Sequence, residues 1–217
     1  MLPVKHVVIS AAGIGSRLEL NMPKCLVDIG GKKIIDYQLH LLRNIPNIRI
    51  VVGFMEDEVI NYIRKIRKDV IFVRNPDYRT TSNSYSLHLA TADLKEPFLS
   101  IDGDLIIDPC SFDRFLRKCG QDKSIVGITK VKTEEAVFAH LDDTKIAKFS
   151  FTEPAEYEWA GIAYLHNIKI QKNTGFVFKE IEKYLPLEAK EIYCHEVDTP
   201  EDLRNAIGAL SQYNYNL

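Results

Sequence analysis

The sequence predicts an α/β three-layer sandwich in which helices cover both faces of a mixed, mainly parallel sheet. The first observation is that short β-branched or apolar runs alternate, from Val4 to Ile101, with segments whose apolar residues have helical spacing. The second is that the chain after Asp104 is richer in strand-like runs. Because strands that alternate with helices of this length form right-handed βαβ units, we expect ligands at the carboxyl ends of the strands.

The predicted elements follow one another in a regular order. In the first half, strands are predicted at 4–10, 48–52, 70–73 and 98–101, and helices at 34–42, 56–66 and 84–92. In the second half, a helix at 112–118 precedes strands at 125–130, 136–141, 145–151, 162–165 and 192–197. Thr199 as N-cap and Pro200 at the first helical position then begin a last helix. No Ser/Gly-rich linker, internal repeat or low-complexity tract divides the chain, so residues 1–217 are predicted to form a single domain.

Composition and charge exclude several classes of protein. The 217 residues are 46% hydrophobic and 27% charged, as in ordinary globular proteins. Lys and Arg number 28 against 30 Asp and Glu, so the chain lacks the positive field that sequence-independent nucleic-acid binding needs. The longest apolar runs are strand-sized, which predicts no membrane span. The N-terminus shows no signal-peptide pattern, which favours a cytoplasmic location. Four scattered cysteines without a CxxC pair indicate neither a zinc ribbon nor a disulfide framework.

A glycine-containing loop, Ala11-Ala12-Gly13-Ile14-Gly15-Ser16-Arg17-Leu18, follows the first predicted strand. Small residues let backbone N–H groups approach a phosphate chain, and Arg17 adds a fixed positive fork. The loop is neither GxGxxG nor GxxxxGK[ST], which excludes the standard dinucleotide fingerprint and Walker A. Pro23 stiffens the loop, and Lys24 brings a second cation near the same strand end. The alternative is a structural glycine turn with a surface arginine.

Two acidic segments are candidates for a metal site. Asp102-Gly103-Asp104 ends an apolar strand, and two carboxylates one residue apart repel each other unless a cation compensates, so the pattern favours Mg²⁺. A strand-to-turn corner with solvated acids is the alternative. In the remote segment Glu196-Val197-Asp198, an extended backbone places Glu196 and Asp198 on one face. The alternative role of Asp198 is to stabilise the N-terminus of the last helix.

The glycine loop, the Met22-Pro23-Lys24 segment and IGGKKIIDYQLHLL at 29–42 together resemble the nucleotidyltransferase superfamily that activates sugar phosphates and small phosphorylated alcohols. The resemblance implies a Rossmann-like sandwich of the GT-A-like nucleotidyltransferase fold. It implies that Arg17 contacts the phosphates of an NTP, that Lys24 stabilises charge around the α-phosphorus, and that Asp104 and Asp198 hold Mg²⁺. It also implies a set of nucleotide-binding residues in the loop and at the strand end: Ala11, Ala12, Gly13, Gly15, Ser16 and Asp102.

The residues of the base and acceptor pockets are predicted from the resemblance of two further segments. SNSYSLHLA at 82–90 is similar to cytidylyltransferases that act on phosphocholine and inositol phosphate, so Ser82, Asn83 and Ser84 are predicted to bind the nucleotide, while one of them N-caps the helix. The segment 158–162 resembles the family's acceptor-lining stretch, which gives the predicted acceptor residues Glu158, Trp159, Gly161 and Glu196. The resemblance also implies a lysine shortly after the strand at 145–149, but the sequence there reads Ser150-Phe151-Thr152. Lys148 and Lys130 are the candidates to take the place of that lysine.

These observations predict a Mg²⁺-dependent nucleotidyltransferase that transfers NMP from an NTP to a small phosphate or phosphonate acceptor and releases pyrophosphate. The resemblance favours CTP as donor and phosphocholine, a polyol phosphate or a sugar phosphate as acceptor. Three alternatives stay open: a sugar-1-phosphate uridylyl-, thymidylyl- or guanylyltransferase, a small DxD glycosyltransferase, and a non-catalytic nucleotide-binding regulatory subunit. A glycosyltransferase would have no triphosphate for the glycine loop and Lys24 to bind.

Overall fold

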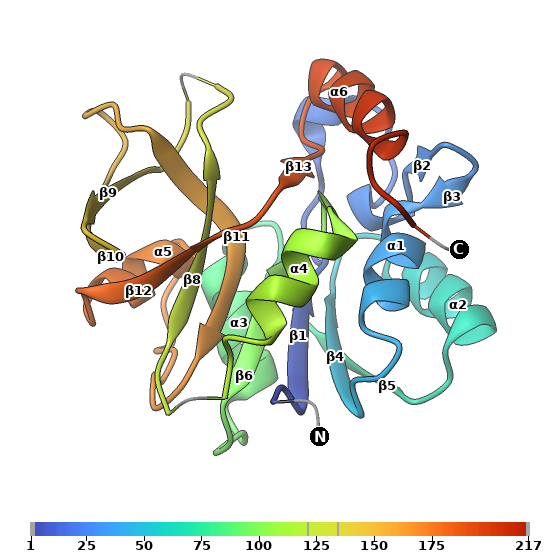
Figure 1. Ribbon diagram of the computed structural model, residues 1–217. Coiled ribbons are helices and arrows are strands. Elements are labelled where there is room, and N and C mark those ends of the chain that lie inside the picture. The colour runs from blue at the N-terminus through green and yellow to red at the C-terminus, as the bar shows by residue number, and fades with distance from the viewer. Residues whose placement is uncertain (1–2, 121, 134, 216–217) are drawn as a thin grey trace.

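The structure is a computed structural model that describes residues 3–120, 122–133 and 135–215, and a nine-stranded mixed sheet forms its centre (Figure 1). The strands are, in chain order, β1 (His6–Ser10), β4 (Asn47–Val52), β5 (Val70–Arg74), β6 (Phe98–Asp102), β8 (Ile125–Lys130), β9 (Phe138–Asp142), β10 (Lys145–Ser150), β11 (Tyr157–Leu165) and β12 (Leu187–Glu191). Their spatial order is β5-β4-β1-β6-β11-β8-β12-β10-β9. Among these described strands only β10 and β11 run against the common direction. The predicted mixed, mainly parallel sheet is confirmed.

β1 is an inner strand because its apolar residues are buried on both faces of the sheet. Val7 and Ile9 lie in one hydrophobic cluster, and Val8 lies in the other. The strand pairs in parallel with β4 and β6, and Ser10 at its end is in register with Asp102 at the end of β6. The polar segments that follow these strands therefore meet at one edge of the sheet.

Helices cover both faces, which completes the three layers (Figure 1). The helices α1 (Ile34–Leu41), α2 (Glu56–Ile66) and α4 (Pro109–Leu116) pack on the face of Val7 and Ile9, and α3 (Asn83–Thr91) and α5 (Val177–Glu182) pack on the opposite face. Each apolar stripe is buried against the sheet, so the two clusters are the main core. None of the helices in the described part of the chain has the length and apolar composition needed to cross a membrane.

The second half of the sheet closes on itself. β11 pairs with β6 and β8, and its first residues also pair with β9. This strand is longer than the predicted 162–165, because its first residues are half-buried and lack the continuous apolar signal of its end. Two elements there were not predicted, β12 and α5, since β12 is a half-buried run of alternating charges and α5 is short.

Two further strands bring remote parts of the chain together. The predicted strand at 192–197 is reduced to β13 (Cys194–Glu196), which pairs antiparallel with β7 (Leu105–Ile107). The N–H of Val197 donates to the carbonyl of Asp104 at 2.9 Å, so the two acidic segments are joined directly. Glu196 and Asp198 lie on one face while Val197 is buried, as predicted.

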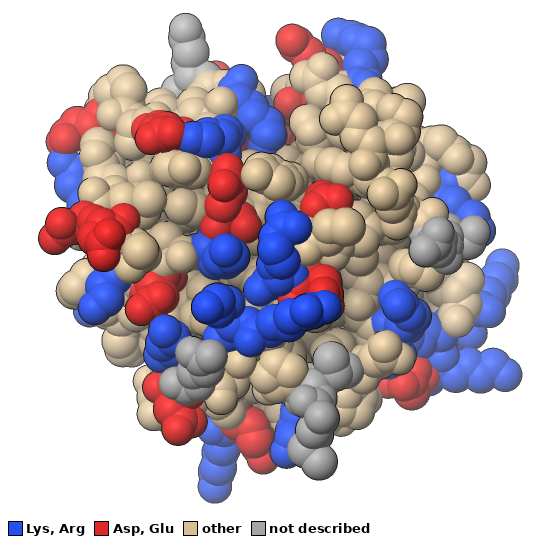
Figure 2. Space-filling model, in the orientation of Figure 1, with Lys and Arg blue, Asp and Glu red and all other residues tan. Residues whose placement is uncertain are grey.

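The last helix, α6 (Pro200–Leu210), begins immediately after β13 and Asp198. Thr199 is its N-cap and forms a capping box with Asp202, and Pro200 occupies the first turn, as predicted. The remaining small elements are a β2 (Asp28–Ile29) and β3 (Lys32–Lys33) hairpin and two 3₁₀ turns, η1 (Ser16–Leu18) and η2 (Lys24–Leu26). The face drawn in Figure 2 carries basic and acidic side chains that are interspersed, in agreement with the near-neutral net charge.

Gly103 allows the turn after β6 to lie directly on the end of β1. Its N–H donates to the carbonyl of Ser10 at 2.9 Å. A Cβ at this position would lie 2.6 Å from that carbonyl oxygen and 3.0 Å from the Cα of Ala11. Because both are backbone atoms, they have little freedom to move away, and only glycine fits here without distortion.

Replacing Gly103 with alanine is expected to lower the free energy of unfolding by about 1 to 3 kcal/mol, because the added methyl overpacks the turn. Gly208 in α6 is the matched control: a Cβ there meets nothing within 4 Å, and Gly208→Ala should stabilise the protein by up to about 1 kcal/mol through helix propensity. Chemical denaturation of both variants measures these changes. Unchanged stability in Gly103→Ala would contradict the close approach.

Candidate active site

A cavity of about 300 Å³ opens at the carboxyl ends of β1 and β6. Most of the residues predicted from sequence line this cavity: Ala11, Ala12, Gly13, Gly15, Ser16, Arg17, Lys24, Ser82, Asn83, Asp102, Asp104, Glu196 and Asp198. They come from segments that are far apart in the sequence, so the fold gathers them at one place. The position agrees with the general rule that open parallel sheets bind ligands outside the carboxyl ends of their strands.

The glycine loop lies at the wall of this cavity and leads into η1. Gly15 adopts a φ of 64°, a left-handed conformation that side chains disfavour. A Cβ there would also lie 2.6 Å from Cγ of Lys24, so the aliphatic part of the lysine packs against the glycine. Leu18 is buried and anchors the end of η1. The loop therefore holds Lys24 in the cavity from one side.

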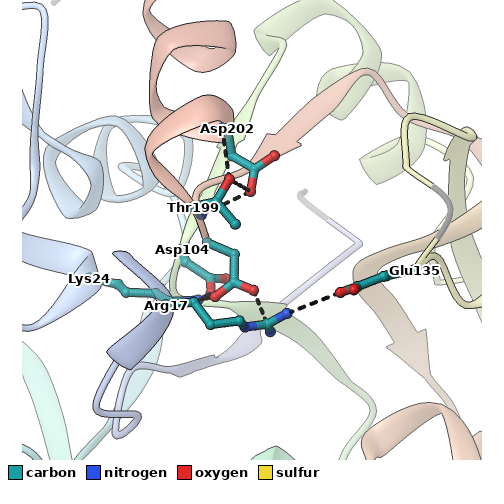
Figure 3. A network of polar contacts seen from close by, with 7 residues as sticks. Arg17, Lys24, Asp104, Glu135, Thr199 and Asp202 are labelled. Atoms are coloured by element: carbon teal, nitrogen blue, oxygen red, sulfur yellow. Dashed lines mark hydrogen bonds and ion pairs between the residues drawn. The ribbon is translucent and has the colours of Figure 1, made fainter. Parts of the chain in front are cut away.

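Lys24 is bonded to both predicted metal ligands (Figure 3). Its Nζ lies 2.7 Å from Oδ2 of Asp104 and 2.5 Å from Oδ1 of Asp198. All three side chains are largely buried, with exposed fractions of 17%, 16% and 11%. An ammonium group between two carboxylates offsets their mutual repulsion, and the low local polarity strengthens both contacts.

Arg17 approaches the same cluster from solvent. Its guanidinium forms an ion pair with Asp198, and its other nitrogen lies 3.8 Å from Glu135 (Figure 3). The Arg17 side chain is 64% exposed, in contrast to that of Lys24. Arg17 can therefore swing toward a ligand at the cavity mouth, whereas Lys24 is fixed at its base.

The cavity wall carries more acids than bases, and their protonation reflects this. Burial and the neighbouring Asp104 raise the pKa of Asp102 to about 7. The negative charge of Asp104, together with burial, also raises the pKa of Glu196. Burial alone would lower the pKa of Lys24, but the two carboxylates outweigh it and raise the pKa above its usual value. Lys24 is therefore a permanent cation at neutral pH.

The residues present fit a magnesium ion. The carboxylates of Asp104 and Asp198 already converge on a cationic group, and carboxylate oxygens are the ligands that Mg²⁺ prefers. Among the described residues, no group of three or more His, Cys, Asp or Glu side chains is arranged to hold a metal. Two carboxylates are enough, because Mg²⁺ in nucleotide sites keeps several waters and takes its other ligands from phosphates.

The polar start of α3 forms the opposite wall. Asn83 donates to Oδ1 of Asp102 at 3.4 Å and accepts from the N–H of Val177 at 3.2 Å. Ser82 occupies the N-cap position, but its hydroxyl donates to the carbonyls of Thr174 and Gly175 and does not cap the helix. Ser82 therefore has the position of an N-cap without the capping hydrogen bond. Ser84 is fully buried, bonds to Asn173 at 3.1 Å and is not among the residues that line the cavity.

Several lining residues were not identified from the sequence. They share a polar or small side chain near the base of α3 or the end of β1, and they are Ser10, Cys25, Asn75, Tyr78, Thr81, Ser86 and Gly103. Asn75 donates to Thr81 at 3.1 Å and to Ser86 at 3.0 Å, so three of them form one network in which Asn75 and Ser86 are buried. The available signal was a dense run of amide and hydroxyl residues at 75–86, which sequence reasoning assigned only in part.

The predicted acceptor residues are placed unevenly. Glu196 lines the cavity, and a Cβ on Gly161 would lie 3.0 Å from Oδ2 of Asp102, so Gly161 supports the cavity from β11. Glu158 and Trp159 are not among the lining residues. Burial raises the pKa of Glu158, whose carboxylate lies 3.8 Å from Lys132. Trp159 is half-buried and packs edge-on against Phe149 at 6.2 Å between ring centroids, beside the hydrophobic cluster that contains Val8.

The two lysines considered as acceptor contacts are engaged elsewhere. Lys148 pairs with Glu153 at 2.5 Å. Lys130 pairs with Glu156, and its Nζ lies over the Tyr157 ring at 4.3 Å from the centroid. Lys132 was not singled out from the sequence, yet its contacts with Glu158 and Thr129 make it the basic residue next to the predicted acceptor segment.

Cys25 is the only described cysteine that lines the cavity. Burial raises the pKa of its thiol to about 12, so the thiol stays protonated and is a poor nucleophile.

Relatives of this chain act in nucleotidyl transfer. The chain is 26% identical over 235 residues to the choline-phosphate cytidylyltransferase of Streptococcus pneumoniae, covering 95% of this chain and 99% of that protein. It is 30% identical over 156 residues to the CTP:phosphoglutamine cytidylyltransferase of Campylobacter jejuni, covering 70% of this chain and 58% of that protein.

The fold has close counterparts among solved structures. The inositol-1-phosphate CTP transferase from T. maritima superimposes with a TM-score of 0.82 at 16% identity, covering 99% of this chain and 98% of that one. At this identity the likeness shows the fold alone, and it confirms the predicted α/β nucleotidyltransferase fold. The sequence model of the family described as MobA-like NTP transferase domain matches residues 7–167, which include the glycine loop, Lys24 and Asp104. The chain therefore belongs to the MobA-like NTP transferase family and is a nucleotidyltransferase.

Proposed function

We propose that this protein is a Mg²⁺-dependent cytidylyltransferase that transfers CMP from CTP to a small phosphate or phosphonate acceptor and releases pyrophosphate. The observation that carries the proposal is the cluster of Lys24, Asp104 and Asp198, with Arg17 at its edge, in the cavity where the parallel strands end. This cluster supplies two cations for phosphates and two carboxylates for a metal in one place.

The charges of the cavity support a requirement for a divalent cation. Asp102, Asp104, Glu196 and Asp198 line the cavity, against Arg17 and Lys24. Arg17 and Lys24 are already paired with Asp198 and Asp104, so an entering triphosphate meets little unpaired positive charge unless a cation accompanies it. Bound Mg²⁺ would neutralise phosphate charge and polarise the phosphorus–oxygen bonds. The pairing of both cations with acids is therefore expected for an enzyme that binds its nucleotide together with a metal.

The residues of the chain would act by positioning and charge neutralisation. The backbone N–H groups of the glycine loop would bind the phosphate chain, and Arg17 would move from Asp198 to the phosphates that leave as pyrophosphate. Lys24 would stabilise negative charge that develops around the α-phosphorus. The acceptor phosphate is already an anion at neutral pH, so its oxygen attacks without a strong general base. The phosphorus–oxygen bond to pyrophosphate breaks as the new bond forms.

CTP is the proposed donor because two curated relatives act with cytidine nucleotides, as their names state. The polar wall formed by Asn75, Thr81, Asn83 and Ser86 supports recognition of a base edge by amide and hydroxyl groups. The acceptor belongs to the same chemical class as phosphocholine, phosphoglutamine or inositol phosphate. Each of these compounds appears in the name of a protein to which this chain is similar. A cytoplasmic location stays a prediction.

A pyrophosphate-release screen of CTP, UTP, ATP and GTP tests the proposal directly. The acceptors are phosphocholine, inositol phosphate, glycerol phosphate, aminoethylphosphonate and a sugar 1-phosphate. We expect release with CTP at least about tenfold faster than with UTP, since an unpaired buried polar group costs about 1 to 3 kcal/mol when the wrong base binds. Preference for UTP or GTP would reject the cytidylyltransferase assignment and favour a sugar-1-phosphate nucleotidyltransferase. A lack of pyrophosphate release with every pair would reject the proposed reaction.

Lys24→Met should lower turnover by on the order of 100- to 1000-fold while weakening CTP binding much less, because a charge at the α-phosphorus acts mainly in the transition state. Methionine keeps the aliphatic packing against Gly15. Lys179→Met, which removes a surface ion pair with Glu182 in α5, is the control and should leave both constants unchanged. Steady-state kinetics and CTP titration separate the two effects. Near-normal turnover in folded Lys24→Met would remove this lysine from the mechanism.

Asp104→Asn and Asp198→Asn should each abolish Mg²⁺-dependent activity, because an amide offers one neutral oxygen where a hard cation favours a carboxylate. Lys24 keeps one carboxylate partner in each variant, so the fold should persist, which circular dichroism checks. Asp113→Asn removes an exposed pair with Arg117 and serves as the control. If Asp198→Asn keeps the wild-type dependence on Mg²⁺, the role of Asp198 is confined to the start of α6.

A further inference from the structure

A buried glutamine supports the turn that carries Asp104. Gln38 lies in α1 with an exposed fraction of 1%. Its Nε2 donates to the carbonyl of Asp102 at 2.9 Å and to the carbonyl of Leu105 at 3.0 Å. These carbonyls stand at the two ends of the segment Asp102-Gly103-Asp104-Leu105, so one amide group fixes the width of the turn.

The other contacts hold the middle of the same turn. The N–H of Gly103 is bonded to Ser10, and the carbonyl of Asp104 accepts from the N–H of Val197, each at 2.9 Å. Gln38 approaches the turn from α1, in the helix layer. Among the hydrogen bonds of the described residues, its side chain is the one that bonds to both ends of the turn.

The amide is costly where it stands, which indicates a role beyond packing. The helix buries apolar side chains at neighbouring positions, among them Ile34, Ile35 and Leu39. Oε1 of Gln38 is buried and has no hydrogen-bond partner in the described part of the chain. An unpartnered buried acceptor destabilises a fold, and an apolar side chain would avoid that cost at this position. What the amide provides is its two N–H donors to the turn.

We propose that Gln38 is a positioning residue that sets the direction of the Asp104 carboxylate and thereby the affinity of the site for its metal. This inference rests on the proposed function, in which Asp104 binds Mg²⁺. Gln38 does not line the cavity, so it touches neither nucleotide nor metal and acts only through the backbone of the turn. Without its donors, the carbonyls of Asp102 and Leu105 lose a buried partner and the turn reorients toward other donors.

Removal of a hydrogen-bond partner of a metal ligand typically weakens metal binding about 10- to 100-fold, and a residue that acts through the backbone of the ligand's turn is expected at the lower end of that range. We therefore expect Gln38→Met, which keeps the length of the side chain and removes both donors, to raise the Mg²⁺ concentration for half-maximal activity by about tenfold or more. Turnover at saturating Mg²⁺ should stay within about threefold of wild type, because Lys24 and Arg17 keep their places. Mn²⁺ binding to the protein alone, measured by the loss of the free-ion electron paramagnetic resonance signal, should weaken by a similar factor.

Tyr37→Phe is the matched control. Tyr37 is the neighbouring residue in α1, is buried, and donates a side-chain hydrogen bond to a backbone carbonyl, that of Ile29, which lies outside the turn. Its loss should lower stability without changing Mn²⁺ binding or the Mg²⁺ dependence. A second variant, Gln38→Glu, keeps the shape and, in its neutral form, one donor. Its metal affinity should lie between those of wild type and Gln38→Met, and it carries the test if Gln38→Met does not fold.

The outcomes are distinguishable. Wild-type Mn²⁺ affinity in folded Gln38→Met, or an equal loss of affinity in Tyr37→Phe, overturns the role of Gln38 and leaves the proposed function standing. A large fall in turnover at saturating Mg²⁺ with unchanged Mn²⁺ affinity also overturns it. If the wild-type protein neither binds Mn²⁺ nor releases pyrophosphate, the proposed function is wrong and the inference is overturned with it. Weakened Mn²⁺ binding confined to the Gln38 variants supports the role of Gln38, and pyrophosphate release from CTP by the wild-type protein supports the proposed function.

Discussion

The contact on which the site depends is the buried ammonium group of Lys24 between the carboxylates of Asp104 and Asp198. Two acids so close together repel each other, and desolvation makes each negative charge more costly. Lys24 offsets both effects and lets the ends of two distant segments meet. Removing one partner of a buried ion pair typically costs about 3 to 5 kcal/mol, because the charge that is left has no partner. The same charges suit a site that exchanges internal ion pairs for a metal and phosphates.

The fold delivers these three residues by different means. Lys24 is placed by the glycine loop and η2, because Gly15 leaves room for the aliphatic part of the lysine. Asp104 is placed by a turn that rests on β1 through Gly103 and on α1 through Gln38. Asp198 is placed by β13, whose pairing with β7 continues into the bond between Val197 and Asp104. Core packing, a tight turn and a two-stranded ladder thus converge on one cluster, which makes the geometry sensitive to the backbone around it.

The two halves of the molecule differ in how firmly their roles are fixed. The first half supplies the four adjacent parallel strands β5, β4, β1 and β6 and most of the cavity wall. The second half closes on itself through the pairing of β9 with β11, and its charged side chains are largely paired with each other. Lys132 and Glu158 stand out there because they lie side by side near β13.

The sequence by itself determined the layer architecture and the glycine loop, because hydrophobic periodicity and a run of small residues are local signals. The start of α6 was equally readable, since the capping box of Thr199 and Asp202 is a local pattern. The tertiary structure alone decided that Asp104 and Asp198 share one lysine, that Ser84 turns away from the cavity, and that Gln38 supports the turn. It also decided the start of β11, whose first residues are half-buried, and the existence of β12, whose residues are all half-buried. These features depend on contacts between remote segments, and local spacing carries no information about which segments the sheet brings together.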